Sequence, residues 1–468
     1  MKVEQLYTGC LAQGAYYIES NGEVAIIDPM REVSEYTDLA ASRNAKIKYI
    51  FETHFHADFV SGHVTLSERT GAPIIFGPNA STSFDSTIAI DNQEFKLGDV
   101  TIKALHTPGH TMESTCYLLI DEQGKEHSLF SGDTLFLGDV GRPDLAVKSD
   151  LTKEDLAGYL FESLRNKIMT LPDNVIVYPG HGAGSACGKN ISTDLVGSIG
   201  DQKQNNYALR NDMTKEEFVK EVTEGILPPP AYFQLNVGLN RDGYKDADVV
   251  LSEAKKAVNH VDFETMADQT GAIVLDVRHQ DEFAAGHIPN SIFIGLNGGF
   301  APWVGALIKD VNQAILLVCH DDQLDETITR LSRVGFDNVI GYLEGGFCAW
   351  KEDEKEIATV DTISSDEFAT LISKVNLHVM DVRKENEYIS EHVIAAKNTP
   401  LDFLNQFMGE FSIEKTNYVH CAGGYRSMIA NSILKARGVH NLVDVQGGFG
   451  AIKNTSAPVS DFVCPSTL

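Results

Sequence analysis

The chain has 468 residues, of which 66 are acidic and 38 basic, so its formal net charge is −28. A field this negative repels phosphate backbones and anionic lipid head groups, which argues against nucleic-acid and membrane binding. The length suggests roughly two to four domains. Seven widely spaced cysteines without a C-x-x-C motif exclude a disulfide framework. Because the start, MKVEQLYTGC, lacks an apolar signal segment, we expect a cytoplasmic protein.

Short strands dominate the predicted structure of the first 240 residues. Their apolar runs cover residues 16–20, 24–29, 47–53, 73–77, 100–106, 115–120, 128–133 and 175–180. One helix is predicted over 152–168. Several of these strands end directly on a histidine or an aspartate, and the loops beyond strand ends are where functional sites are built.

The second half of the chain contains an internal repeat. The tripeptide DVR at 276–278 recurs at 381–383, and GGF at 345–347 recurs at 447–449. Cys319 and Cys421 are likewise 102 residues apart. A period near 100 residues is that of a domain, so we predict two similar domains in tandem. Breaker and charged segments at 227–230 and 351–356 mark the boundaries.

Within each repeat, apolar strands alternate with amphipathic helices. Strands are predicted at 272–278, 315–319, 377–383 and 417–421, and helices at 326–336 and 427–439. This alternation is typical of an α/β domain with a parallel sheet covered by helices on both faces.

Histidine and aspartate residues gather in glycine-flanked loops of the first domain. Imidazole and carboxylate groups are the ligands of borderline divalent metals, so the set predicts a metal site. Two further histidines, His63 and His106, are interpreted as ordinary loop residues. The candidate ligands lie in THFHAD, TPGHT, SGDT and YPGHG: His54, His56, Asp58, His110, Asp133 and His181.

These motifs, in this order, resemble the metallo-β-lactamase superfamily, which implies an αββα sandwich with a metal site at one edge of its two sheets. Many relatives are two-zinc hydrolases with the motif H-x-H-x-D-H, but here Phe59 follows Asp58. The first domain is most similar to the persulfide dioxygenases, whose single Fe(II) is held by two histidines and one aspartate. That resemblance implies one iron per chain on His54, His110 and Asp133. His56, Asp58 and His181 would then orient these ligands or hold an alternative metal.

Two residues near this cluster are candidates for substrate binding. Arg142, in the segment GRPD, could hold a substrate carboxylate bidentately; alternatively, it pairs with Asp139 or Asp144. Cys187 follows His181 by six residues and could accept sulfur near the metal; alternatively, it is a small buried loop residue.

The last domain carries the loop CAGGYR between a predicted strand and a helix. The amides of Gly423 and Gly424, the helix N-terminus and the charge of Arg426 should stabilise Cys421 as a nucleophilic thiolate. This loop resembles that of the rhodanese (sulfurtransferase) family, which implies Cys421 and Arg426 as catalytic residues. The middle domain resembles the same family, but its loop after Cys319 carries four carboxylates, so we predict that it is inactive.

Together the resemblances imply a persulfide dioxygenase–rhodanese fusion with domains at 1–245, 255–355 and 360–462. A low-molecular-weight thiol persulfide, O2 and water would give thiol and sulfite. Sulfane sulfur carried by Cys421 would then convert sulfite to thiosulfate, a route of sulfide detoxification. We expect a homo-oligomer that binds neither nucleic acid nor membranes. Two alternatives stay open: a two-zinc thioester hydrolase, and a sulfur carrier or sensor without dioxygenase activity.

Overall fold

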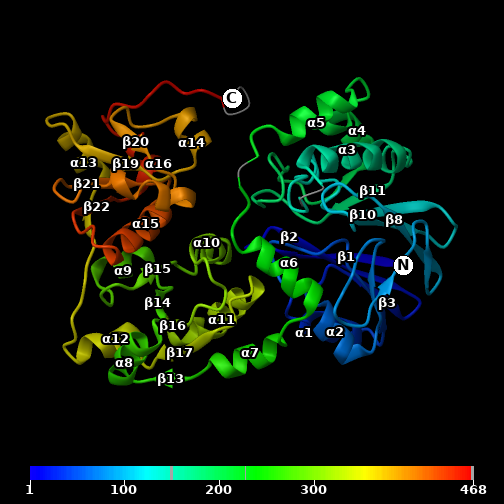
Figure 1. Cartoon of the computed structure of the whole chain (residues 1–468), viewed down its shortest axis with the longest axis horizontal. Coiled ribbons are helices and arrows are strands. Elements are labelled where there is room, and N and C mark those ends of the chain that lie inside the picture. Colours follow the sequence, from blue (N-terminus) through cyan, green and yellow to red (C-terminus); the bar gives the residue numbers. More distant parts are fainter. Residues whose placement is uncertain (148–150, 227, 465–468) are drawn as a thin grey trace. The chain divides into compact units, whose positions relative to one another are not determined.

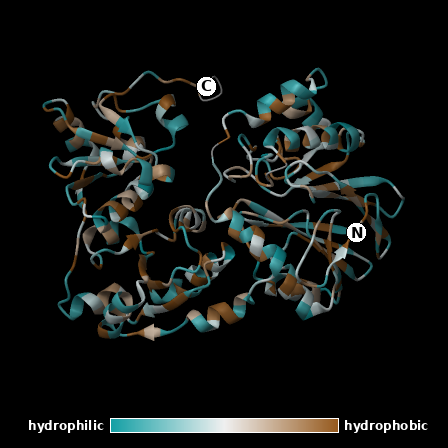
Figure 2. Ribbon diagram, viewed as in Figure 1, coloured by the Kyte–Doolittle hydropathy of each residue, from teal (hydrophilic) through white to brown (hydrophobic). Residues whose placement is uncertain are grey.

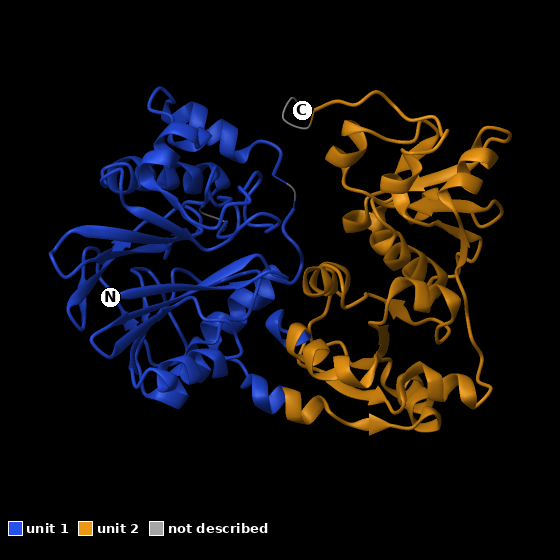
Figure 3. Ribbon diagram, turned by 180° about the vertical axis from the view of Figure 1, so that it is seen from behind, with its two compact units in different colours: residues 1–250, 331–335 blue, residues 251–330, 336–468 orange. Residues whose placement is uncertain are grey.

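The computed structural model describes residues 1–147, 151–226 and 228–464. Contacts within the chain divide it into two compact units (Figure 3). The first comprises Met1–Val250 with Leu331–Gly335, and the second comprises Leu251–Arg330 with Phe336–Leu468. Residue 227, the first of the predicted breaker segment 227–230, lies outside the described residues.

Two six-stranded sheets form the first unit (Figure 1). Their strand orders are β1-β2-β3-β4-β5-β6 and β12-β11-β10-β9-β8-β7. The strands of the first sheet are β1 (Lys2–Thr8), β2 (Gln13–Ser20), β3 (Glu23–Ile27), β4 (Lys46–Phe51), β5 (Ile74–Phe76) and β6 (Thr87–Ile88). Those of the second are β7 (Glu94–Leu97), β8 (Val100–His106), β9 (Thr115–Ile120), β10 (Glu126–Gly132), β11 (Ile176–Pro179) and β12 (Gly197–Ser198).

Helices cover the outer faces of both sheets, as an αββα sandwich requires. The helices of this part of the chain are α1 (Ser34–Ser42), α2 (His63–Thr70), α3 (Lys153–Ser163), α4 (Ile199–Asn205), α5 (Lys215–Thr223), α6 (Phe233–Asp242) and α7 (Ala247–Ala254). One apolar core lies between the sheets, a second packs α1 and α2 on the first sheet, and a third packs α3, α4 and α5 on the second. Because both faces of the sheets are covered, their central strands read as continuous apolar runs rather than alternating ones.

Most predicted elements of this unit are confirmed. Each of the eight predicted strands corresponds to an observed one, and the helix predicted at 152–168 is α3 continued by a π-helical turn at Leu164–Ile168. α3 begins at a capping box, in which the Thr152 hydroxyl accepts a hydrogen bond from the Asp155 amide. β1 and the short strands β6, β7 and β12 carry no comparable apolar run and were not predicted.

The second unit contains two five-stranded sheets whose strands are all parallel. Their orders, β13-β17-β16-β14-β15 and β18-β22-β21-β19-β20, correspond strand for strand. The first sheet has β13 (Ala257–Val258), β14 (Ile273–Asp276), β15 (Ile292–Phe293), β16 (Ile315–Val318) and β17 (Val339–Leu343). The second has β18 (Asp361–Ile363), β19 (His378–Asp381), β20 (Ala396–Asn398), β21 (Asn417–His420) and β22 (Leu442–Val445).

Helices again alternate with the strands, which confirms the predicted α/β architecture. Those around the first of these sheets are α8 (His260–Thr270), α9 (Gln280–Ala285), α10 (Phe300–Leu307), α11 (Leu324–Arg333) and α12 (Gly346–Glu352). Those around the second are α13 (Ser365–Ile372), α14 (Glu385–Ser390), α15 (Tyr425–Ala436) and α16 (Gly448–Ile452). Helices such as α7 carry hydrophobic and hydrophilic residues side by side (Figure 2).

The repeated sequence motifs occupy matching positions in the two parallel-sheet domains. Asp276 accepts hydrogen bonds from the guanidinium of Arg278 at 2.6–3.1 Å, and the repeat places Asp381 and Arg383 in the same arrangement. Each guanidinium also lies over the ring of the GGF phenylalanine, 4.2 Å from Phe347 in one domain and 4.0 Å from Phe449 in the other. The DVR and GGF motifs therefore stabilise the fold of each domain through an ion pair and a cation–π contact.

None of the helices in the described ranges is both long and apolar enough to cross a membrane.

Candidate functional site

Three of the predicted metal ligands converge in the first unit. His54 follows β4, His110 lies in the loop between β8 and β9, and Asp133 follows β10 directly. Each is buried, and one ligand atom from each lies within 4.8 Å of the others. His54 Nε2 is 3.9 Å from Asp133 Oδ2, and His110 Nε2 is 3.5 Å from the same oxygen. Neither carboxylate oxygen of Asp133 has a hydrogen-bond partner among the described residues.

The Nδ1 atoms of both histidines, which do not face Asp133, contact other groups of the protein. His54 Nδ1 lies 3.0 Å from the Thr53 hydroxyl, which itself donates to Asp28 Oδ2 at 2.8 Å. His110 Nδ1 lies 2.9 Å from the carbonyl oxygen of Arg142. Both rings can therefore carry their proton on Nδ1 and offer Nε2 to a metal. Burial and the neighbouring histidines lower the pKa of His54 well below its ordinary value, which keeps it neutral and able to bind.

Two glycines leave just enough room for this arrangement. A Cβ at Gly141 would lie 2.0 Å from the carbonyl oxygen of Asp133 and 2.9 Å from His110 Nδ1. A Cβ at Gly180 would lie 2.6 Å from Asp133 Oδ1. The GRPD and YPGHG segments therefore approach Asp133 so closely that a side chain at either glycine would displace it.

His56 does not join the first three ligands. Its Nε2 lies 3.1 Å from Asp28 Oδ1 and 3.3 Å from Glu52 Oε2, and all three side chains are buried. Burial alone would lower the pKa of His56, but the two carboxylates raise it well above its ordinary value. His56, Asp28 and Glu52 therefore form a third buried group, with one ligand atom of each within 4.8 Å of the others, in which the two carboxylates favour the protonated form of His56.

Asp58 and His181 lie on the other side of Asp133. His181 Nε2 is 3.4 Å from Asp58 Oδ2 and 3.5 Å from Asp133 Oδ1. Cys187 completes a second buried group with these two residues, again with one ligand atom of each within 4.8 Å of the others. Phe59, which follows Asp58, is fully buried with its ring 4.4 Å from that of His56.

Arg142 and Cys187 are linked through their backbones. The Arg142 amide donates to the Cys187 carbonyl at 3.0 Å, while the Arg142 carbonyl lies against His110. The Arg142 side chain pairs bidentately with Asp144, at 2.7 and 2.8 Å, as the alternative interpretation expected. Burial, Asp58 and Asp133 raise the pKa of the Cys187 thiol well above its ordinary value.

Sequence reasoning missed the buried acids below the site. Asp28 and Glu52 lie at the ends of the predicted strands 24–29 and 47–53, where they could have been noticed as strand-end carboxylates. Asp28 has a φ of +50°, in the left-handed region that non-glycine residues adopt uncommonly and aspartate adopts more readily than most. His63 is also not a loop residue, because it opens α2 and lies fully buried 3.4 Å from Glu52.

The predicted nucleophile of the second unit lies between β21 and α15. The Gly424 amide, at the N-terminus of α15, donates to Cys421 Sγ at 3.1 Å. Gly424 has a φ of +104°, which turns its amide toward the sulfur. The GGF turn supports the loop from below, since the Phe449 amide donates to the Cys421 carbonyl at 2.6 Å. Gly423 lies exposed beside these groups.

Arg426 pairs with Glu387 of α14 through two hydrogen bonds of 2.6 and 2.9 Å. Burial disfavours its charged form, but Glu387 more than offsets this and raises the pKa of Arg426. The guanidinium is therefore charged and fixed in position next to the loop.

The matching loop of the middle domain has the opposite electrostatics. Cys319 is buried, and burial together with Asp321 and Asp276 raises its pKa to about 12. His320 Nε2 lies 3.1 Å from Glu282, and no arginine occurs in the segment 319–326. A thiol in these surroundings stays protonated at neutral pH.

Family models match three segments of the chain. Residues 8–181 match the Metallo-beta-lactamase superfamily, and residues 259–353 and 364–455 each match the Rhodanese-like domain.

The chain is also similar to solved structures and to curated proteins. A metallo-beta-lactamase from Staphylococcus aureus subsp. aureus COL is 29% identical, with a TM-score of 0.64, over 74% of this chain and 98% of that one. ETHE1 from Myxococcus xanthus is 28% identical over 52% of this chain and 98% of that one, with a TM-score of 0.44.

Among curated proteins, the hydroxyacylglutathione hydrolase of Rhizobium etli is 37% identical over 34% of this chain and 57% of its own length. The chain spans 57–66% of the length of this and two other curated relatives of that kind.

Proposed function

We propose that this chain, a metallo-β-lactamase domain followed by two rhodanese-like domains, is a non-haem iron persulfide dioxygenase coupled to a sulfurtransferase. Its first unit oxidises a low-molecular-weight thiol persulfide with O2 and water to thiol and sulfite. Its last domain transfers sulfane sulfur from a second persulfide to sulfite and gives thiosulfate.

One observation carries the proposal: the first metal group consists of two imidazoles and one carboxylate, and His56 lies outside it, beside Asp28 and Glu52. Two histidines and one carboxylate on one face are the ligand set of mononuclear ferrous oxygenases. When bound, Fe(II) supplies the redox chemistry with dioxygen that amino-acid side chains lack.

The residues around this group position its three ligands. Thr53 and the Arg142 carbonyl fix the ring orientation of His54 and His110. Asp133 keeps both oxygens free of hydrogen bonds within the described residues. Because the three ligand side chains are buried, a persulfide reacts there away from bulk water. The guanidinium of Arg142, to bind a substrate carboxylate, would have to exchange Asp144 for it, and this role stays a prediction.

The sulfur transfer rests on Cys421. Its thiolate attacks the outer sulfur of a persulfide, the S–S bond breaks, and the carrier thiol leaves with a proton. Sulfite then attacks the sulfur now held on Cys421, and the thiolate is the leaving group. The Gly424 amide, 3.1 Å from the sulfur, and the α15 N-terminus stabilise that thiolate. We propose no such chemistry for Cys319, whose surroundings favour the thiol.

Oxygen uptake tests the dioxygenase step. The full chain, loaded with iron, is given glutathione persulfide or coenzyme A persulfide, and O2, sulfite and thiosulfate are measured. We expect O2 consumption matched by sulfite plus thiosulfate. No oxygen uptake by a fully iron-loaded chain would overturn this step.

The sulfur-transfer step is tested with Cys421→Ser. This variant should keep its oxygen uptake but accumulate sulfite in place of thiosulfate. Cys319→Ser is the matched control and should behave like the unaltered chain. If Cys421→Ser still formed thiosulfate and Cys319→Ser did not, the assignment of the two domains would be reversed.

A metal-dependent thioester hydrolase is the second candidate. Asp58 and His181 lie beside the first group, as two-metal hydrolysis requires, and curated relatives are named hydroxyacylglutathione hydrolases. Hydrolysis of a hydroxyacylglutathione thioester by the zinc-loaded chain, without oxygen uptake by the iron-loaded chain, would favour this candidate.

A further inference from the structure

The loop that carries three of the candidate ligands is buried along its whole length. This ligand loop, residues 52–62, joins β4 to α2 and contains His54, His56 and Asp58. Every residue in it is buried. Its backbone amides and carbonyls therefore need hydrogen-bond partners elsewhere in the protein, and those partners decide how firmly the loop is held.

Asn240 of α6 binds the ligand loop through three hydrogen bonds. Its Nδ2 donates to the carbonyl oxygens of His56 and Phe59, both at 2.8 Å, and its Oδ1 accepts from the Ser61 amide at 2.8 Å. The side chain is only 1% exposed, so water does not compete for these bonds. Because the three bonds reach residues before and after Asp58, a single side chain fixes the loop on both sides of it.

The Val60 amide of the same loop binds a segment from within the first Rhodanese-like match. It donates to the Arg333 carbonyl at 2.7 Å. Arg333 ends α11, but Leu331–Gly335 belong to the first unit by their contacts (Figure 3). Arg31, which is fully buried, holds this 331–335 segment through a hydrogen bond of 2.6 Å to the Ser332 carbonyl.

Gly335 marks the point where the 331–335 segment meets α6. A Cβ at this glycine would lie 2.8 Å from Asn236 Oδ1 and 3.0 Å from Leu239 Cδ1. Asn236 is about one helical turn before Asn240 on α6. The 331–335 segment, α6 and the ligand loop therefore pack on one another, and a displacement of one is transmitted to the others.

We infer that Asn240 and the 331–335 segment are positioning elements of the first metal group, which hold the ligand loop in its metal-binding conformation. Both lie outside residues 8–181, which match the Metallo-beta-lactamase superfamily. The middle domain thus contributes chain to metal binding, even though we propose no sulfur chemistry for it. Ligands that are ordered before the metal arrives lose less entropy when they bind it. The inference goes beyond the proposed function, because it holds whichever metal and substrate the first group takes.

Asn240→Ala in the full chain tests the first positioning element. Co²⁺ affinity is measured without oxygen by competition with a chelator, and the visible d–d absorption of the bound ion reports the arrangement of its ligands. We expect the affinity to fall about tenfold or more and the absorption to shift. Asn236→Ala is the matched control: Asn236 is equally buried on the same helix, but neither of its amide atoms has a hydrogen-bond partner among the described residues. Unchanged affinity in Asn240→Ala, or an equal loss in Asn236→Ala, would overturn the role of Asn240.

Gly335→Ala tests the 331–335 segment with Asn240 in place. Its new methyl group must push against Asn236, so we expect a severalfold loss of Co²⁺ affinity. Gly438→Ala is the matched control, because Gly438 has a φ of +87° against +83° at Gly335 and a Cβ there meets nothing within 4 Å. Both variants strain a left-handed residue, and only Gly335→Ala disturbs α6.

An equal effect of the two glycine variants, or no effect of Gly335→Ala, would overturn the role of the 331–335 segment. The readout is the affinity and absorption of Co²⁺. Absence of oxygen uptake by the unaltered, iron-loaded chain would therefore refute the proposed function and leave this inference standing.

Discussion

At the scale of single residues, the candidate iron group depends on a hydrogen-bond relay that does not itself touch the metal. The Thr53 hydroxyl donates a hydrogen bond to Asp28 Oδ2 at 2.8 Å and lies 3.0 Å from His54 Nδ1. Asp28 therefore orients the hydroxyl that in turn orients the His54 ring. The Thr53 amide also donates to Asp28 at 2.7 Å. Asp28 thus fixes both the backbone and the hydroxyl of the residue that precedes the first ligand.

Removing the relay should weaken metal binding without unfolding the domain. Thr53→Val keeps the shape of the side chain but cannot hold His54 Nδ1, so we expect iron affinity to fall about 10–100-fold. Competition with a chelator measures this. Thr53→Ser retains the hydroxyl and is the control, and equal affinities for the valine and serine variants would contradict the relay.

Asp444 gives the second unit a pH dependence that can be measured. It is buried on β22, where its Oδ1 accepts a hydrogen bond from Asn431 at 3.2 Å. Burial raises its pKa to about 7 from an ordinary value of 3.8. Between these two values the unfolded chain has lost the proton and the folded chain retains it, so stability falls as pH rises toward 7 and then levels off.

Asp444→Asn should abolish this loss of folding stability with rising pH. We expect the variant to be more stable than the unaltered chain at about pH 8, by an amount of order a few kcal/mol, and nearly equal to it at about pH 4. Denaturant unfolding of the second unit at several pH values measures the difference. Asp361→Asn, an exposed change on β18, should show no such trend. A stability difference independent of pH would contradict the interpretation.

At the scale of elements, the middle domain supports the start of α15. The Tyr425 hydroxyl donates to the Gly295 carbonyl at 2.7 Å, and its ring is so close to Gly298 that a Cβ there would lie 2.3 Å from it. Further along α15, Ser432 accepts a hydrogen bond from the Phe293 amide at 3.0 Å. Because α15 begins one residue after Gly424, these contacts also set the position of the amide that faces Cys421.

Displacing Tyr425 should therefore slow sulfur transfer from a distance. Gly298→Ala must push the ring away, and we expect kcat/KM for sulfur transfer to fall about tenfold while oxygen uptake is unchanged. Gly409→Ala, where a Cβ meets nothing within 4 Å, is the control. An unaltered transfer rate in Gly298→Ala would show that the middle domain does not position the loop.

Elements with a strong local signal could be predicted from the sequence, whereas contacts between elements could not. Apolar runs gave the central strands, and the glycine-flanked motifs gave His54, His110 and Asp133. His56 lies beside Asp28 and Glu52 and outside the first metal group, because the pairing of β3 with β4 brings these two acids together. The spacing from His181 suggested that Cys187 lies near the metal, but its closeness to Asp58 depends on a loop held by Arg142 and Asp139, which no local pattern indicates.

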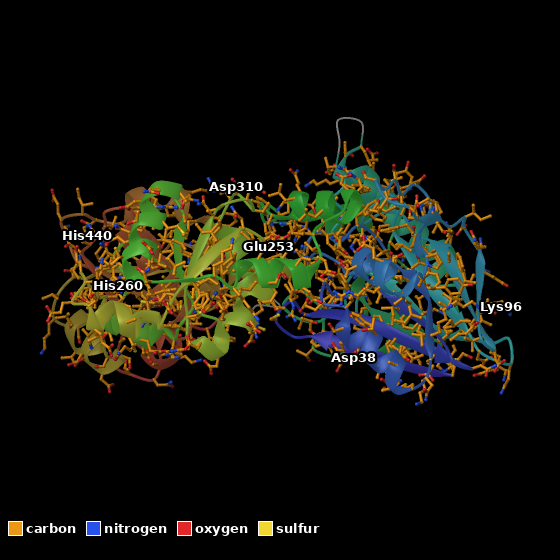
Figure 4. The ribbon with its side chains drawn as sticks, turned by 90° about the horizontal axis from the view of Figure 1, so that it is seen from below. Asp38, Lys96, Glu253, His260, Asp310 and His440 are labelled. Atoms are coloured by element: carbon orange, nitrogen blue, oxygen red, sulfur yellow. The ribbon has the colours of Figure 1, made fainter. Side chains whose placement is uncertain are left out.

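At the scale of the whole molecule, the net charge of −28 acts on every anion that the proposed function requires. Exposed charged side chains such as Asp38 and Lys96 lie at the surface of the first unit (Figure 4). Arg426 does little to reverse the field at long range, because Glu387 compensates its charge at 2.6 Å. Sulfite therefore meets repulsion on approach and attraction only when it reaches the loop amides.

Salt should then accelerate the transfer to sulfite. The screening length falls from about 30 Å at 0.01 M to about 8 Å at 0.15 M ionic strength, which removes long-range repulsion before it affects contacts inside the loop. We expect the second-order rate constant of sulfite with the persulfide form of Cys421 to rise severalfold over this range. An uncharged thiol acceptor, which the field does not repel, should show no such rise. A rate constant for sulfite that falls with salt would mean that Arg426 attracts sulfite at long range despite Glu387, and Glu387→Gln would then steepen that fall.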